Sequence, residues 1–266
     1  DLYADPKSDA VERDLATGAA AAAAVRADCQ GRLAALAPGD LAAAIGRYEA
    51  LQDLLGKLSS YASLLYAADT ADPVRAKFHG DIQDRLTTIT KDLIFFELEL
   101  NKLDDTDAAR LSAAPQLARV RPWLEDIRKE KPHQLDDKLE ELFHDKHATG
   151  RAAWNRLFNE TMTALRFKIE GEELTLEPTL NLLSDAREPK RRAAAEALAA
   201  VFKSNIRLFT LITNTLAKDK EISDRWRGYS DVAASRHLSN RVEPEVVEAL
   251  VAAVRAKYPA IAHRYY

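Results

Sequence analysis

Two long segments of this chain carry an apolar side chain every third or fourth residue, and this spacing limits the possible folds more than any other feature. The period matches the 3.6-residue turn of an α-helix and excludes a strand, in which apolar positions alternate. The apolar positions are Leu41, Ile45, Tyr48, Leu51, Leu55, Leu58, Ala62 and Leu65 in one segment, and Val74, Phe78, Ile82, Leu86, Ile89, Leu93, Phe96, Leu100 and Leu103 in the other. We predict two helices of about 30 residues, each ~45 Å long. Only a short turn at Asp72 and Pro73 separates them, so they should pack antiparallel as a hairpin. Their apolar side chains should form the core between them.

The rest of the chain is also predicted to be helical, with one exception. A first helix should begin at Ser8 or Asp9 and run towards Leu36, before the break at Pro38-Gly39-Asp40. Further helices are predicted over 107–113, 116–129, 135–147, 151–165, 189–225 and from 244 to the last residue, Tyr266. Residues 166–169 and 174–176 alternate around a Glu-Gly-Glu turn, which predicts a β-hairpin. The predicted fold is mainly α, with a long-helix hairpin over 1–104 and a helical lobe over 105–266.

The composition excludes several classes of protein. The formal charge is −4, from 38 basic and 42 acidic groups, so the basic excess of nucleic-acid-binding proteins is absent. Cys29 is the single cysteine and cannot form an intrachain disulfide. No apolar run reaches the length of a membrane span, and the first residues show no signal-peptide pattern. We therefore expect a soluble, cytoplasmic protein without nucleic-acid or membrane partners.

The residues alone predict no active site. His144 and His147 are three positions apart, whereas a zinc protease helix needs His-Glu-x-x-His, in which four-residue spacing aims both imidazoles at one ion. One hypothesis is nevertheless a zinc enzyme that uses these two histidines, and it would require metal bound to this chain alone. The carboxylate pairs at 136–137 and 140–141 are predicted to be solvated helix faces. There is no Gly-rich phosphate loop and no serine or cysteine nucleophile motif.

One polar stretch between two predicted helices gathers unusual residue types. It reads Arg225-Trp226-Arg227-Gly228-Tyr229-Ser230, followed by Ser235-Arg236-His237-Leu238-Ser239-Asn240. A segment of this kind can present side chains to a ligand. Alternatively, it is a capped turn whose arginines pair with neighbouring carboxylates.

Several segments, read in order, resemble the N-terminal half of the oligoendopeptidase F-type zinc peptidases, which are similar to thimet oligopeptidase. The similar segments are 58–70 (LSSYASLLYAADT), 95–100 (FFELEL), 132–135 (PHQL), 150–158 (GRAAWNRLF), 214–220 (NTLAKDK), 227–230 (RGYS) and 235–238 (SRHL). The resemblance implies a mostly helical fold in which an N-terminal lobe faces a catalytic lobe across a deep channel. It also implies hydrolysis of internal bonds of short peptides by one zinc ion. In that family a His-Glu-x-x-His motif and a later glutamate bind the metal, and the motif glutamate activates its water.

The chain departs from the family pattern because it stops before that motif. No metal ligand or catalytic residue carries over, so the resemblance implies a non-catalytic half that is inactive alone and binds no zinc itself. Its partners would be oligopeptide substrates and its own C-terminal catalytic half. As substrate contacts, the resemblance points to Tyr229, Arg236 and His237. The start at Asp1 and the end at Tyr265-Tyr266 also make the chain look like part of a longer protein.

The alternative is a non-catalytic helical scaffold that binds other proteins through the long hairpin. A finished scaffold should cap its last helix and bury its aromatic residues. The peptidase half should instead expose a large apolar face where its catalytic half belongs.

Overall fold

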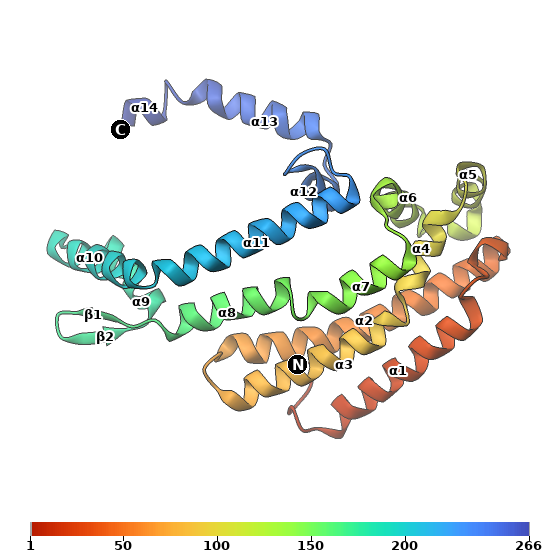
Figure 1. Ribbon diagram of the computed structural model, residues 1–266, viewed down its shortest axis with the longest axis horizontal. Helices are drawn as coiled ribbons and strands as arrows, with labels where there is room; N and C mark the ends of the chain where they lie inside the picture. Colours follow the sequence, from red (N-terminus) through yellow and green to blue (C-terminus); the bar gives the residue numbers. More distant parts are fainter. Residues whose placement is uncertain (1, 266) are drawn as a thin grey trace.

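A computed structural model describes residues 2–265, and it begins with three helices that lie side by side (Figure 1). They are α1 (Asp9–Cys29), α2 (Pro38–Ala68) and α3 (Pro73–Lys91). Pro38 lies in the first turn of α2 and Pro73 in the first turn of α3, where a missing N–H costs nothing. Asp72 caps α3 by accepting hydrogen bonds from the N–H groups of Val74 and Arg75. The predicted antiparallel hairpin of α2 and α3 is confirmed.

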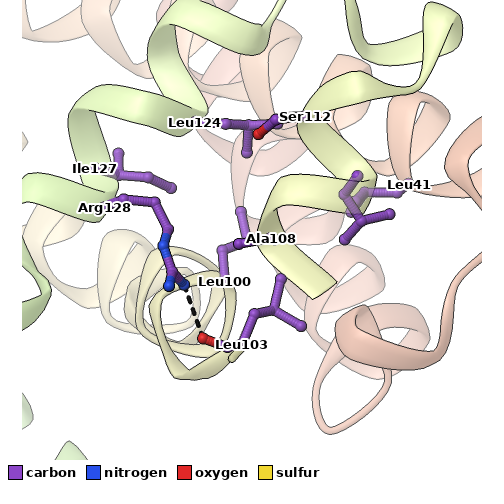
Figure 2. A pocket seen from close by; sticks show the side chains of 9 residues that line it. Leu41, Leu100, Leu103, Ala108, Ser112, Leu124, Ile127 and Arg128 are labelled. Carbon is purple, nitrogen blue, oxygen red and sulfur yellow. Dashed lines mark hydrogen bonds between the residues drawn. The ribbon is translucent and has the colours of Figure 1, made fainter. Parts of the chain in front are cut away.

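The stripes predicted from the sequence form most of the main core, but the prediction that Val74 belongs to the second stripe is wrong, because it is 64% exposed in the first turn of α3. Phe96, Leu58, Leu41, Leu15 and Leu33 are among its completely buried side chains. Tyr48 stacks on Phe96 with ring centroids 4.5 Å apart and planes 7° from parallel. The same core also takes in side chains from the helices that follow the hairpin, as far as Ile127, which Figure 2 shows around a small pocket together with Leu124 and Leu100.

Two predicted helices of this region are shorter than expected. The helix expected to reach Leu36 ends at Cys29, because Gly31 turns the chain with φ +76°, and a one-turn 3-10 helix follows at Leu33–Ala35. The helix expected to run to Leu103 ends at Lys91 and resumes as α4 (Ile94–Lys102). The two residues at this break keep helix-like dihedral angles, so the apolar spacing continues through it.

Short helices then lead away from the hairpin: α5 (Asp105–Ala113), a 3-10 turn (Pro115–Leu117), α6 (Arg121–Glu130), a 3-10 turn (Lys131–His133), α7 (Asp137–His147) and α8 (Arg151–Ala164). The helix predicted over 116–129 is thus divided by a break between Leu117 and Arg121. The helices predicted over 107–113, 135–147 and 151–165 are confirmed to within two residues at each end. Helices α7 and α8 run along the hairpin in Figure 1, where Tyr66 of α2 donates a hydrogen bond to Glu160 of α8.

The predicted β-hairpin is present, with one strand shifted. Strand β1 (Phe167–Ile169) pairs antiparallel with β2 (Glu172–Leu174), in a register that places Phe167 opposite Leu174. Glu170 and Gly171 both have positive φ, 52° and 92°, so these two residues form the turn and Glu172 already belongs to the strand. Leu176, expected in the second strand, begins helix α9 (Leu176–Asn181).

The long helix predicted over 189–225 is two helices. After a 3-10 turn at Leu182–Ser184, α10 (Glu188–Ser204) ends at Asn205, and α11 (Ile206–Arg227) runs back alongside α8 (Figure 1). The Asn205 N–H and side-chain amide both donate to the Val201 carbonyl, which closes α10.

The chain then forms α12 (Ala234–Ser239), α13 (Pro244–Lys257) and α14 (Ala262–Tyr265). The last predicted helix was expected to run unbroken to Tyr266, but Pro259 interrupts it after Lys257; Tyr266 itself lies outside the described residues. Helix α13 extends away from α11 in Figure 1, and none of its residues is buried. Among residues 2–265, no helix has the combination of length and apolarity that crossing a membrane requires.

Candidate functional site

The end of α11 is fixed by a glycine cap. Gly228 has φ +69°, a left-handed conformation that side chains with a Cβ disfavour. Its N–H donates to the Arg225 carbonyl at 3.3 Å, and the Tyr229 N–H donates to the Asp224 carbonyl at 2.9 Å. This pair of bonds is the Schellman arrangement, which ends a helix and reverses the chain. The prediction of a capped turn is therefore confirmed.

Arg227, one residue before the cap, makes a two-pronged ion pair with Glu140 of α7. Both nitrogen–oxygen distances are 2.7 Å, and the two side chains are 24% and 13% exposed. Burial acts to raise the pKa of Glu140, but hydrogen bonds from Arg227 and from the Leu135 N–H hold this pKa below its ordinary value. The prediction that Glu140 belongs to a solvated face is wrong, because its partner comes from a helix 87 residues away in the sequence.

Two further hydrogen bonds, both between His133 and Arg227, connect the same two segments. The His133 Nδ1 lies 2.8 Å from the Arg227 carbonyl oxygen, and Arg227 Nη1 donates to the His133 carbonyl at 3.2 Å. A carbonyl oxygen can only accept, so Nδ1 carries a proton in this contact. We call the set His133, Glu140 and Arg227 the α7–α11 clamp. It ties the chain before α7 to the end of α11 through backbone and side chain alike.

Tyr229 lies on top of the clamp. Its ring stacks on that of His133, with centroids 3.9 Å apart and planes at 19°, and its hydroxyl donates to Glu130 at 3.2 Å. Burial and the neighbouring Glu130 carboxylate raise the pKa of Tyr229 to about 12. Tyr229 therefore stays a neutral hydrogen-bond donor at physiological pH.

Two of the three predicted contact residues meet at one cavity. A hollow of about 410 Å³, here called the α12 cavity, is lined by His133, Tyr229, His237, Leu238, Arg241 and Val242, among others. His237 is half-buried there, and Arg241 pairs with Asp126 at 3.0 Å. Arg236 does not line this cavity; it is exposed on α12, and its side chain has no charged partner among the described residues. The arrangement offers aromatic faces and hydrogen-bonding groups to a ligand.

The residues that the structure describes do not fit a zinc site. Within residues 2–265 there is no group of three histidine, cysteine, aspartate or glutamate side chains that could hold a metal ion. The Nε2 atom of His144 lies 3.2 Å from both the Thr90 hydroxyl and the Thr87 carbonyl, so this histidine is occupied in packing α7 against α3. His147 is exposed. These positions do not support the hypothesis of a zinc enzyme based on His144 and His147.

Sequence reasoning missed the clamp. His133 lies in one of the segments that carry the family resemblance, but no role was predicted for it. Glu140 gave no signal, since it sits beside Glu141 in a charged helix like any solvated residue.

Comparison with known proteins places this fold. The family model described as Oligopeptidase F matches residues 99–167. The crystal structure of oligoendopeptidase-F from Enterococcus faecium superimposes with a TM-score of 0.83 and 19% identity, over 96% of this chain and 51% of that one. A second crystal structure, of a predicted peptidase from Chlamydophila abortus, superimposes with a TM-score of 0.63 and 16% identity, over 98% of this chain and 44% of that one.

No curated protein matches the sequence. The chain spans about half the length of the solved structures that it resembles. Its fold over nearly the whole length and its sequence over residues 99–167 confirm the predicted resemblance to the N-terminal part of the oligoendopeptidase F family.

Proposed function

We propose that this chain is the channel-forming N-terminal part of a zinc-dependent oligoendopeptidase that cleaves internal bonds of short peptides. The observation that carries the proposal is the superposition on oligoendopeptidase-F, at a TM-score of 0.83 over 96% of this chain. Zinc, its ligands and the catalytic base would come from the catalytic half, since the described residues offer no metal site. The chain by itself would be inactive.

An exposed apolar face on α13 supports the proposal that a catalytic half packs against this chain. Helix α13 exposes apolar side chains along its length, and the loop after it continues the pattern: Val246, Leu250, Val251, Val254, Tyr258 and Ile261. Leu250 is 64% exposed and Ile261 is 66% exposed. Contiguous apolar surface of this kind is typical of an interface. We assign this face to the catalytic half.

The α12 cavity is the proposed place where this part contacts the peptide. Tyr229 and His237 would offer hydrogen bonds and ring faces to the peptide backbone, while Arg236 would contact the substrate from the exposed side of α12. The competing role for Tyr229 is structural, because its ring and its hydroxyl already have partners in the clamp region.

The alternative is a non-catalytic helical scaffold that binds other proteins through the long hairpin of α2 and α3. Intact mass and peptide sequencing of the protein purified from its own cell discriminate the two. A natural product that carries His-Glu-x-x-His and cleaves internally quenched short peptides, with loss of activity on zinc chelation, supports the peptidase. A natural product limited to these 266 residues supports the scaffold.

The substrate contacts need a test in the complete enzyme. We expect Arg236→Ala and His237→Ala to raise KM for short peptides severalfold without altering the melting temperature. Arg207→Ala is the matched control, since Arg207 is an exposed arginine near the opposite end of α11. Unchanged KM and kcat in correctly folded Arg236→Ala would remove Arg236 from the site.

A further inference from the structure

A second cavity adjoins the α12 cavity at Tyr229. It has a volume of about 440 Å³ and is bounded by the α7–α8 junction, the C-terminal half of α11 and the start of α12. Figure 1 shows α7 and α8 following one another beside α11, and the residues that line the cavity place the α7–α8 junction opposite the C-terminal half of that helix. Tyr229 is the residue that lines both cavities. The proposed function does not involve this second cavity.

The lining of this cavity is rich in cations. Lys146, Arg151, Lys220 and Arg227 contribute four positive side chains, against the two carboxylates of Asp219 and Asp224. This excess is local, because the whole chain carries a formal charge of −4. We call the space the cationic cavity.

Two of the four cations are already neutralised. Lys220 pairs with Asp224 and donates to the Ser235 hydroxyl at 3.0 Å, and Arg227 is held by Glu140 in the clamp. For Lys146 and Arg151, neither an ion pair nor a side-chain hydrogen bond occurs within residues 2–265. Asp219 offsets one of these two charges, so the cavity retains one uncompensated positive charge.

A tight turn holds the two unpaired cations at the same cavity. The Gly150 N–H donates to the Lys146 carbonyl at 2.8 Å, and a Cβ added at Gly150 would come within 2.9 Å of that carbonyl oxygen. Only glycine allows this approach without a shift of the backbone. The last turn of α7, with Lys146, therefore lies next to the first turn of α8, with Arg151. The unpaired backbone N–H groups of a first helical turn add to the positive potential there.

We propose that the cationic cavity binds a carboxylate of the peptide substrate; this inference rests on the proposed function. Lys146 and Arg151 would hold the carboxylate, because a single uncompensated positive charge matches a group of charge −1. Asp219 would accept an N–H of the peptide and would repel a dianion such as phosphate. Phe143 and Tyr229 provide apolar walls for the neighbouring residue of the peptide. The carboxylate can be the C-terminus of the peptide or an acidic side chain.

Calorimetric titration of the 266-residue chain with three peptides tests the proposal. The peptides are acetyl-Ala-Ala-Phe-Ala-Ala with a free C-terminus, the same peptide with a C-terminal amide, and the amide with glutamate in the fourth position. We expect the free acid to bind about fivefold more tightly than the amide, the effect of one solvent-accessible ion pair, and less so at high salt. An equal gain for the glutamate peptide identifies a side-chain carboxylate as a second source.

The variants separate this cavity from general charge effects. Lys146→Ala/Arg151→Ala should abolish the preference for the free acid and leave the affinity for the amide unchanged. Lys203→Ala/Arg207→Ala removes two exposed cations, one from the end of α10 and one from the start of α11, and should retain the preference. Arg207 lies about 18 Å along α11 from Asp219.

The outcomes also distinguish this proposal from the proposed function. Equal affinity for the free acid and the amide overturns the carboxylate site and leaves the peptidase proposal intact. If no peptide binds but acetate shifts the amide resonances of Lys146 and Arg151, the cavity binds a carboxylate but the peptide as its ligand is overturned. If neither peptides nor acetate bind, the carboxylate site is overturned, and the peptidase proposal is judged separately by zinc-dependent cleavage of short peptides in the complete protein.

Discussion

The N-terminal and the C-terminal regions of this molecule are stabilised by different kinds of interaction. Among the described residues, the core that includes α1 to α6 contains 27 buried side chains, whereas the core around the β-hairpin and α10 contains three, and α13 contains none. Polar contacts of the α7–α11 clamp and the glycine cap fix the end of α11 instead. The comparison teaches that the first region can fold on its own apolar surface, while the second depends on a few directed bonds and leaves an apolar face unmatched.

The largest effect should follow from a cavity in the N-terminal core. Phe96→Ala removes a completely buried ring that stacks on Tyr48, and we expect the free energy of unfolding to fall by about 3–5 kcal/mol. Urea denaturation followed by far-ultraviolet circular dichroism measures this loss. Leu64→Ala, in α2 but 66% exposed, should cost less than about 0.5 kcal/mol. Similar losses in the two variants would contradict the assignment of the core.

The clamp should give the next largest effect. Glu140→Ala leaves Arg227 half-buried without its carboxylate, and we expect a loss of about 2 kcal/mol, below that of a fully buried pair because water reaches both groups. A double-mutant cycle with Arg227→Met isolates the coupling between the two side chains. Hydrogen exchange should accelerate over residues 228–243 and remain slow in α2. Additive losses would show that the two side chains do not stabilise each other.

The clamp also predicts a direction for the effect of pH. The pKa of Glu140 lies below its ordinary value of 4.5, so its contribution to stability is complete above that pH and is lost as the pH falls through the lowered pKa. Stability of the wild type should therefore decrease between neutral and acid pH more steeply than that of Glu140→Gln. Parallel profiles of the two proteins would show that Glu140 has the same pKa in the folded and unfolded chains.

The same contrast explains which features the sequence could predict. The stripe from Leu41 to Leu65 identified α2 because each residue of a buried helix face reports the helical period. The break after Lys91 was missed because helix-like dihedral angles at the break preserve that period. Pairing of an arginine in the stretch 225–230 with a carboxylate was predicted, but Glu140 was not identified as the partner, because the pair depends on how distant helices pack. Glu140 does not differ from a solvated residue in its local sequence, whereas Gly228 and the arginines beside it left a local signal.

The cap should have a smaller effect than the clamp. Gly228→Ala places a Cβ on a residue with φ +69°, and we expect a loss of about 1 kcal/mol with faster exchange of the Tyr229 amide. Gly56→Ala is the matched control, because it lies inside α2, has ordinary helical geometry and meets no atom within 4 Å of the added Cβ. That substitution should stabilise the protein by about 0.5–1 kcal/mol. If both substitutions destabilised the protein, the left-handed conformation of Gly228 would not explain the loss.

The smallest effect on folding is expected from replacing a leucine of α13 by alanine, although the same replacement in the buried core is costly. Leu58→Ala, at a position 1% exposed, should lose about 3 kcal/mol, whereas Leu250→Ala, at a position 64% exposed, should lose less than about 0.5 kcal/mol. Both residues are leucines within helices, so the difference measures only what surrounds them. A loss above about 1 kcal/mol for Leu250→Ala would mean that α13 folds against another part of this chain. In the complete peptidase that we propose, the same substitution should become costly, because the catalytic half would then bury the leucine that the isolated chain leaves in water.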